Sequence, residues 1–218
     1  MAKLPSGPLA DVDAEFERMA LETGGATFGL SGTSAREKLL QVTAHDICLA
    51  NVGLAFKMHI QAMNMHGVSY GDMLALIRFV APYAGYPAAA SSLEALRRYG
   101  AELGLKVAAD VDPERSGEER AEAVVPVADQ WLGEFLASRL GRAWTEDRLS
   151  ARERAFVALT AHVTLGELGP SFRRHVKLAL AAASVDEVRD AVRFTGEMGV
   201  TRAVAALEAL EAVLAAQG

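Results

Sequence analysis

The chain contains only one cysteine, Cys48, among its 218 residues. A single cysteine cannot form an intrachain disulfide or a zinc site made of several thiolates. The five histidines include no His-x-x-x-His pair, and no Glu-x-x-His pair recurs as a di-iron helical bundle would need. We therefore expect no metal centre, and the cysteine usage is compatible with the reducing cytoplasm, where we expect the protein to be located.

Long apolar runs and a surplus of positive charge are also missing. The run FVAPYAGYPAAASSL is too short and too interrupted by proline and glycine to cross a bilayer, and the first residues, MAKLPSGPLADVDAEFERMA, lack the apolar core of a signal peptide. The formal charge of −6 argues against general nucleic-acid binding, which requires a basic face. Hydrophobic residues make up 51% of the chain, enough for a folded core. We expect a soluble protein with neither a membrane nor a nucleic-acid partner.

What the chain does contain is an internal repeat. SAREK at 34–38 matches SARER at 150–154, an offset of 116 residues. The same offset aligns Leu49 with Leu165, Gly53 with Gly169, Phe56 with Phe172 and His59 with His175. The order of these matches predicts a gene duplication.

Two one-residue shifts extend this alignment to the end of each half. After the first, SYGD at 69–72 matches SVDE at 184–187, and after the second, Gly85 matches Gly199. Both four-residue segments have a serine followed three residues later by an acid, which predicts a capping box at the start of a helix. We call residues aligned by these three offsets equivalent.

The hydrophobic pattern predicts helices throughout, because no stretch shows the sustained alternation of a strand. We predict an all-α fold of two tandem helical repeats with pseudo-twofold symmetry: residues 1–101, a charged linker at 102–127, and residues 128–218. Several segments are apolar on every face, which requires burial against other helices or other subunits. The predicted helices are 12–21, 34–49, 55–66, 69–82, 87–100, 128–140, 150–164, 170–183, 184–198 and 200–216.

Four segments resemble the carboxymuconolactone decarboxylase family of the alkylhydroperoxidase D-like superfamily. They are SAREK, KMHIQAM, the GVS helix start and PYAGYPAA, and the resemblance covers about residues 28–98 and, more weakly, about 144–212. The resemblance implies an all-α fold of helical hairpins and a homo-oligomer, here a trimer of duplicated subunits.

The peroxidase branch of that family uses a Cys-x-x-Cys pair just before the helix histidine. In this chain the corresponding positions are Val52 and Ala55 before His59, and Leu168 and Ser171 before His175. Peroxidase chemistry needs a nucleophilic thiolate and a resolving partner. The absence of both thiols excludes that activity.

The decarboxylase branch acts on small carboxylated lactones or related keto acids without a metal or organic cofactor. Such chemistry requires an acid to protonate the carbanion, which a histidine with a carboxylate partner supplies. The candidate catalytic residues are His59, Glu37, which precedes it by 22 residues, and the adjacent His45 and Asp46.

A further set of residues is expected to bind the substrate, namely Tyr83, Asn51 and His175. Each candidate also has a structural interpretation: Glu37 suits a first helical turn, and the histidines suit caps or buried hydrogen bonds. The first half is richer in polar residues, which favours one catalytic half and one structural half. The alternative is a catalytically silent helical scaffold or small-molecule-binding protein of the same fold.

Overall fold

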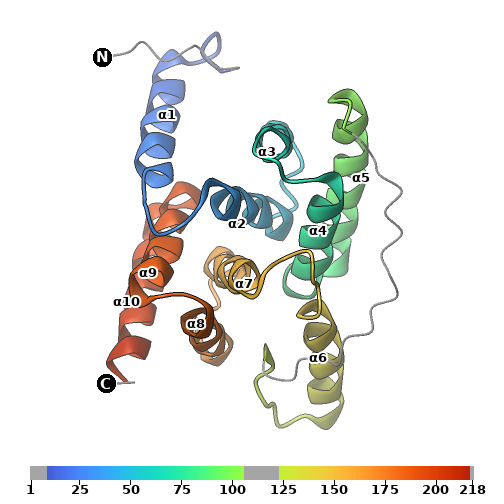
Figure 1. The fold of residues 1–218 in the computed structure, drawn as a ribbon, viewed down its shortest axis with the longest axis vertical. Coiled ribbons are helices and arrows are strands. Elements are labelled where there is room, and N and C mark those ends of the chain that lie inside the picture. The colour runs from blue at the N-terminus through green and yellow to red at the C-terminus, as the bar shows by residue number, and fades with distance from the viewer. Residues whose placement is uncertain (1–8, 106–122, 217–218) are drawn as a thin grey trace.

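The computed structural model describes residues 9–105 and 123–216, and within them every regular element is a helix (Figure 1). The predicted all-α class is therefore confirmed. No helix in these two ranges is long and apolar enough to span a membrane. In chain order the helices are α1 (Ala14–Phe28), α2 (Ala35–Cys48), α3 (Leu54–Met65), α4 (Tyr70–Ala84), α5 (Tyr86–Glu102), α6 (Gln130–Ala143), α7 (Ala151–Leu165), α8 (Pro170–Ala182), α9 (Val185–Phe194), the 3₁₀ helix η2 (Thr195–Met198) and α10 (Val200–Ala215).

Two predicted ranges differ from the observed helices. The helix predicted at 12–21 continues to Phe28, although Gly24 and Gly25 lie inside it and glycine disfavours a helix by about 1 kcal/mol. Tertiary contacts offset that cost, because the Thr27 hydroxyl donates to Glu197 of η2 at 2.6 Å. The range predicted as one helix at 184–198 is divided into α9 and η2.

The helices of the two halves begin at matching positions. α1 and α6, α2 and α7, and α3 and α8 begin 116 residues apart, whereas α4 and α9 begin 115 apart and α5 and α10 begin 114 apart. These spacings are the three offsets at which the sequence aligns with itself. Equivalent residues therefore occupy equivalent places in their helices.

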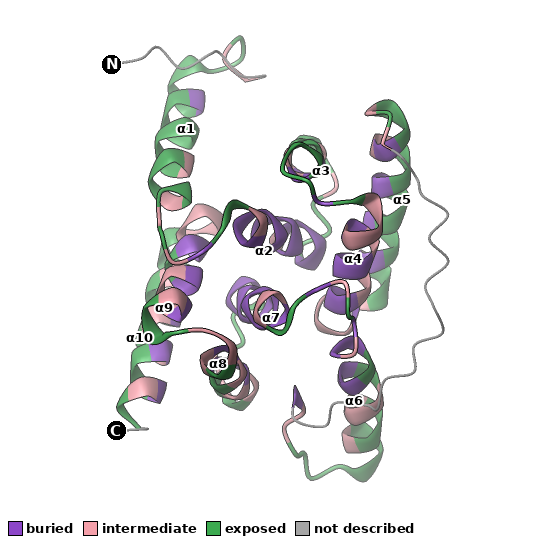
Figure 2. Ribbon diagram, viewed as in Figure 1, coloured by how far each residue is buried: buried purple, intermediate pink, exposed green. Residues whose placement is uncertain are grey.

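Helices α2 and α7 lie side by side at the centre of the molecule and are buried along almost their whole length (Figure 2). This agrees with the apolar character of VALTAHV, which leaves no polar face for solvent. In Figure 1, α4, α5 and α6 lie on one side of this pair, and α1, α9 and α10 on the other. The two halves thus share one hydrophobic core.

Contacts between the halves occur in exchanged pairs. Arg36 Nε donates to Glu153 Oε1 at 2.6 Å, and the equivalent Arg152 Nε donates to Glu37 Oε1 at 2.5 Å. An aromatic pair is exchanged as well: the Phe28 and Phe194 rings lie 5.2 Å apart, and the equivalent Trp144 and Phe79 rings 5.6 Å apart, both edge to face. Each of these contacts has a counterpart in which the two halves are exchanged, as an approximate twofold relation between the halves requires.

A serine caps the start of four helices, two of which were predicted from the Ser-x-x-acid spacing. Ser34, Ser69, Ser150 and Ser184 all form capping boxes, in which the serine oxygen accepts from the third helical amide and the acid accepts from the serine amide. The predicted boxes at 69–72 and 184–187 are confirmed.

The predicted linker at 102–127 falls largely outside the described residues. α5 includes Glu102, and the chain is described again from Ala123 onwards. The proposed boundaries of the two repeats therefore stay a prediction.

Replacing Ser69 by alanine should lower the free energy of unfolding by about 1 kcal/mol, because the Asp72 amide loses its cap. Urea titration monitored by circular dichroism measures this change. Ser91→Ala is the matched control, because Ser91 is an exposed serine in the interior of α5, and it should change stability by less than about 0.5 kcal/mol. Equal losses in both variants would contradict the capping account.

Candidate functional site

An aspartate–histidine pair joins α2 and α3 in the first half. His59 Nδ1 donates to Asp46 Oδ2 at 2.6 Å, and Asn51 Nδ2 donates to Asp46 Oδ1 at 3.2 Å. The Asp46 side chain is 2% exposed, whereas the His59 side chain is 26% exposed. Because the carboxylate only accepts, the His59 proton is held at Nδ1 and Nε2 is left with a lone pair. This arrangement suits proton transfer at Nε2.

His45 lies within electrostatic reach of this pair and of Arg202. His45 Nδ1 lies 3.0 Å from the Thr164 hydroxyl of α7. Burial lowers the pKa of His45; Asp46 opposes this shift, and the positive charges of Arg202 and His59 add to it. Arg202 is exposed on α10, and no carboxylate of the described residues pairs with it. The cluster thus combines a paired imidazole, a second imidazole that burial favours in its neutral form, and a cation.

The equivalent residues of the second half are His162, in place of Asp46, and His175, in place of His59. His162 Nε2 and His175 Nδ1 lie 2.9 Å apart, and the two residues are 3% and 0% exposed. Trp144 Nε1 donates to the Tyr83 hydroxyl at 2.8 Å, and that hydroxyl lies 3.1 Å from His175 Nε2. Since the indole nitrogen only donates, the tyrosine proton is directed at His175.

These hydrogen bonds indicate which ring nitrogens of the two buried histidines carry a proton. The Ser171 carbonyl, which can only accept, lies 2.9 Å from His175 Nδ1, so Nδ1 carries the His175 proton and His162 Nε2 accepts. Burial lowers the pKa of His175 to about 3 and that of His162 to about 4. Both imidazoles are therefore neutral near pH 7 and enclosed by protein.

The structure does not bring Glu37 to His59. The Glu37 carboxylate accepts from the Ser34 amide at 2.7 Å and from Arg152 at 2.5 Å. It lies nine residues before Asp46 on the same helix, or roughly 13 Å along the axis. Glu37 therefore belongs to a helix cap and an ion pair between the halves, and Asp46 is the carboxylate that contacts the imidazole.

The predicted substrate-binding residues have different surroundings. Tyr83 of α4 and His175 of α8 form a buried hydrogen bond between the two halves, and burial raises the pKa of Tyr83 far above its usual value. Asn51 is exposed and positions Asp46. Cys48 is buried in the core, and burial raises its thiol pKa to about 12, so a thiolate is disfavoured. Within the described ranges, no three His, Cys, Asp or Glu side chains are grouped so that they could hold a metal ion.

Sequence reasoning missed Arg202 and Glu197. Glu197 stands two residues before Gly199, as Tyr83 stands two residues before Gly85. Each accepts a hydrogen bond from a residue at the end of the other half's first helix, Thr27 for Glu197 and Trp144 for Tyr83. Because Gly199 aligns with Gly85, Glu197 occupies the position of Tyr83, the residue that hydrogen-bonds to His175. This alignment could have identified Glu197 from the sequence.

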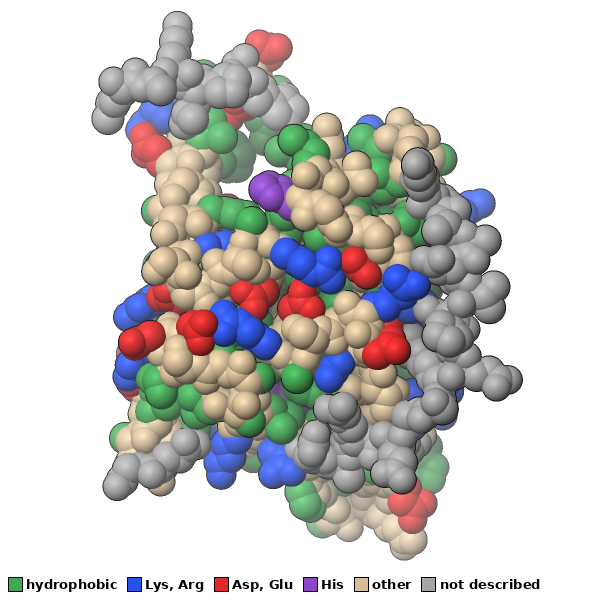
Figure 3. Space-filling model, in the orientation of Figure 1, with side chains coloured by type: hydrophobic (Ala, Val, Ile, Leu, Met, Phe, Trp, Pro, Cys, Tyr) green, Lys and Arg blue, Asp and Glu red, His purple; other side chains and the backbone are tan. Residues whose placement is uncertain are grey.

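On the face shown in Figure 3, the molecule is hollowed between α1 and α3.

Lowering the pH should destabilise the protein through His162 and His175. Their folded-state pKa values of about 4 and 3 lie below the ordinary histidine pKa of 6.5, so the unfolded chain binds more protons as the pH falls. The stability they contribute is complete above pH 6.5 and is lost as the pH falls towards 3. Urea unfolding between pH 7.5 and 4 measures this loss.

Between pH 7.5 and 4, the free energy of unfolding should fall by at least about 1 kcal/mol less in the double variant His162→Gln/His175→Gln than in the wild type. His66→Gln is the control, because His66 is exposed at the end of α3 and the variant should keep the full dependence. Identical pH profiles for wild type and the double variant would show that these histidines do not carry the effect.

No known protein family model matches this chain, and no curated protein matches it either.

Proposed function

We propose that this chain is a cofactor-independent enzyme of the decarboxylase or lyase type, acting on a small carboxylated lactone or keto-acid-like molecule. The observation that carries the proposal is the 2.6 Å hydrogen bond between Asp46 and His59, whose imidazole is partly exposed. A buried carboxylate beside Nδ1 orients the ring and stabilises its protonated form. Nε2 is then the atom that exchanges a proton with the substrate.

The proposed reaction breaks the bond between a carboxylate carbon and the neighbouring carbon. Carbon dioxide leaves, and the electron pair of that bond passes into an enolate, which a cation or hydrogen-bond donor stabilises. His59 takes up a proton from water at Nε2 and passes it to the carbanion carbon, which returns the imidazole to its neutral form.

Neighbouring groups suit an anionic substrate. Arg202 is a cation without a carboxylate partner among the described residues, so it is available to bind a substrate carboxylate. His45 supplies a second imidazole whose pKa is lowered by burial. Glu197, by its alignment with Tyr83, is the candidate for a second carboxylate on the Nε2 side of His59.

We assign the chemistry to the first half and a structural role to the second. His175 has both ring nitrogens engaged and no exposed surface, so it cannot exchange protons with a substrate. His59 has one nitrogen engaged by Asp46 and part of its ring at the surface. The duplicated His thus serves two purposes.

The remaining parts of the proposal concern ancestry and assembly. We propose that the two halves descend from one unit similar to the carboxymuconolactone decarboxylase family, and that the protein works in the cytoplasm as a trimer. Exposed apolar side chains on α1, α3, α6 and α10 support assembly, because subunit association would remove them from water. They include Phe16, Met19, Leu54, Met58, Met65, Trp131, Phe135, Val200 and Val204.

The central test is His59→Ala, assayed for carbon dioxide release from a panel of carboxylated lactones and β-keto acids. Turnover should fall by about 100-fold or more, the range for a lost general acid or base. Asp46→Asn should lower turnover as well, because the imidazolium loses its stabilising charge. His66→Ala is the control and should keep wild-type activity, since His66 is exposed outside the cluster.

Three outcomes of this test are informative. Full activity in His59→Ala would refute the proposed acid–base role. Loss of turnover in His175→Ala, with the fold retained, would place the chemistry in the other half. Failure of the wild type to turn over any substrate would favour the catalytically silent scaffold.

Assembly is tested separately. Light scattering at micromolar concentration should give the mass of three chains of 23.2 kDa each. A mass corresponding to one chain would refute the trimer without bearing on the Asp46–His59 pair.

A further inference from the structure

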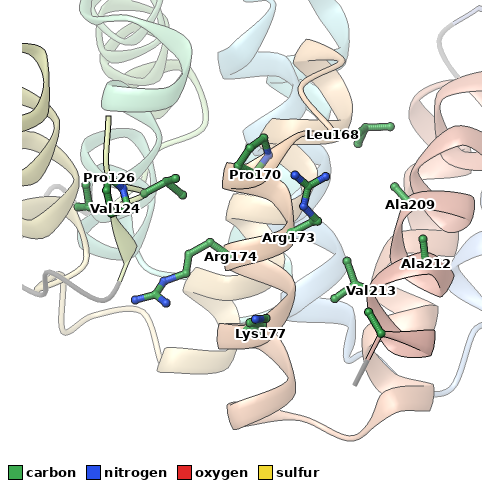
Figure 4. A pocket seen from close by; sticks show the side chains of 12 residues that line it. Val124, Pro126, Leu168, Pro170, Arg173, Arg174, Lys177, Ala209, Ala212 and Val213 are labelled. Atoms are coloured by element: carbon green, nitrogen blue, oxygen red, sulfur yellow. The ribbon is translucent and has the colours of Figure 1, made fainter. Parts of the chain in front are cut away.

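A cavity of about 700 Å³ lies in the second half, away from the Asp46–His59 pair. Its walls are α8, α10 and the segment 124–126 (Figure 4). The volume falls within the range of about 300–1,000 Å³ that is typical of small-molecule sites. The chemistry of its walls indicates the class of ligand that would fit.

One wall is basic and the others are apolar. Arg173, Arg174 and Lys177, all on α8, line the cavity, and among the described residues no carboxylate lines it. Arg173 and Lys177 are exposed and four residues apart, so they share a helix face. In Figure 4, Arg173 points towards Leu168, and Arg174 extends towards the segment 124–126. The opposite wall is the alanine- and valine-rich face of α10.

In the first half, the equivalent space is closed by larger side chains. Lys57, the equivalent of Arg173, donates to Glu102 at 2.6 Å. Tyr99 lies under the Lys57 ammonium, 5.5 Å from nitrogen to ring centroid, and its hydroxyl donates to the Val52 carbonyl at 2.9 Å. An aromatic ring and an ion pair thus join α3 to α5.

The second half lacks each of these groups. At the equivalent positions, Val213 replaces Tyr99, Ala216 replaces Glu102 and Ala212 replaces Arg98. All three replacements line the cavity. The cavity therefore arises where three large side chains of the first half are replaced by small ones, and Arg173 is left without the acid that pairs with its counterpart.

We propose that this cavity binds an amphipathic organic anion, with a carboxylate or phosphate head at Arg173 and Lys177 and an apolar body against α10. Guanidinium and ammonium groups bind either head through charge-assisted hydrogen bonds. The alanine and valine side chains of α10 offer an apolar body a surface on which it is removed from water. This inference does not depend on the proposed decarboxylase activity.

Isothermal titration calorimetry of the full chain tests the proposal, with decanoate and decyl phosphate as probes. At least one should bind saturably with one site per chain, and the tighter of the two identifies the head group. Decanol has the same apolar body without the charge, and inorganic phosphate has the charge without the body. Both should bind at least about tenfold more weakly.

Two variants restore features of the closed first half. Ala216→Glu supplies the acid that Glu102 provides, and Val213→Tyr fills the space with the ring of Tyr99; each should weaken binding at least about tenfold. Ala216 is exposed at the end of α10, so its substitution leaves the core intact. Arg173→Gln should weaken binding similarly, whereas the matched Lys57→Gln in the first half should not.

The proposal is overturned by any of three results. Neither anion binds, decanol binds as tightly as decanoate, or Ala216→Glu and Arg173→Gln both leave binding unchanged while circular dichroism shows the native fold.

Discussion

The packing of α2 against α7 is the constraint on which the rest of the structure depends. The two helices are buried almost throughout, and Glu37 and Glu153 each close a helix cap while pairing with an arginine of the other half. Because these carboxylates are only partly exposed, their attraction to Arg36 and Arg152 is screened less than that of surface pairs. These two ion pairs join the first turns of α2 and α7 across the two halves.

Burial then distinguishes two side-chain pairs that occupy equivalent places. Asp46 and His59 form a pair with one exposed ring, whereas His162 and His175 form a pair enclosed by Tyr83. A carboxylate stabilises a protonated imidazole, but desolvation of two adjacent imidazoles disfavours any charge on them. The same backbone arrangement therefore holds a partly exposed aspartate–histidine pair in one half and a buried, neutral hydrogen-bond network in the other.

The two halves also differ at the basic cavity, but there the second half is the more accessible one. There the first half is closed, by Tyr99 and by the Lys57–Glu102 ion pair, and the second half is open. Small side chains on α10 remove both packing and a negative charge, and this leaves a cation at the edge of an apolar space. Each half thus has one closed region and one accessible region, and both proposed sites lie where equivalent positions differ.

The sequence by itself determined the features whose causes are local. Serine–acid spacing predicted the helix starts at Ser69 and Ser184, because a capping box depends on residues only three positions apart. The internal repeat predicted which helices correspond. Only the tertiary structure decided the partners: Asp46 rather than Glu37 for His59, and Tyr83 for His175. Those contacts depend on how helices cross and on which side chains lose water, and neither is encoded in the spacing of residues along one helix.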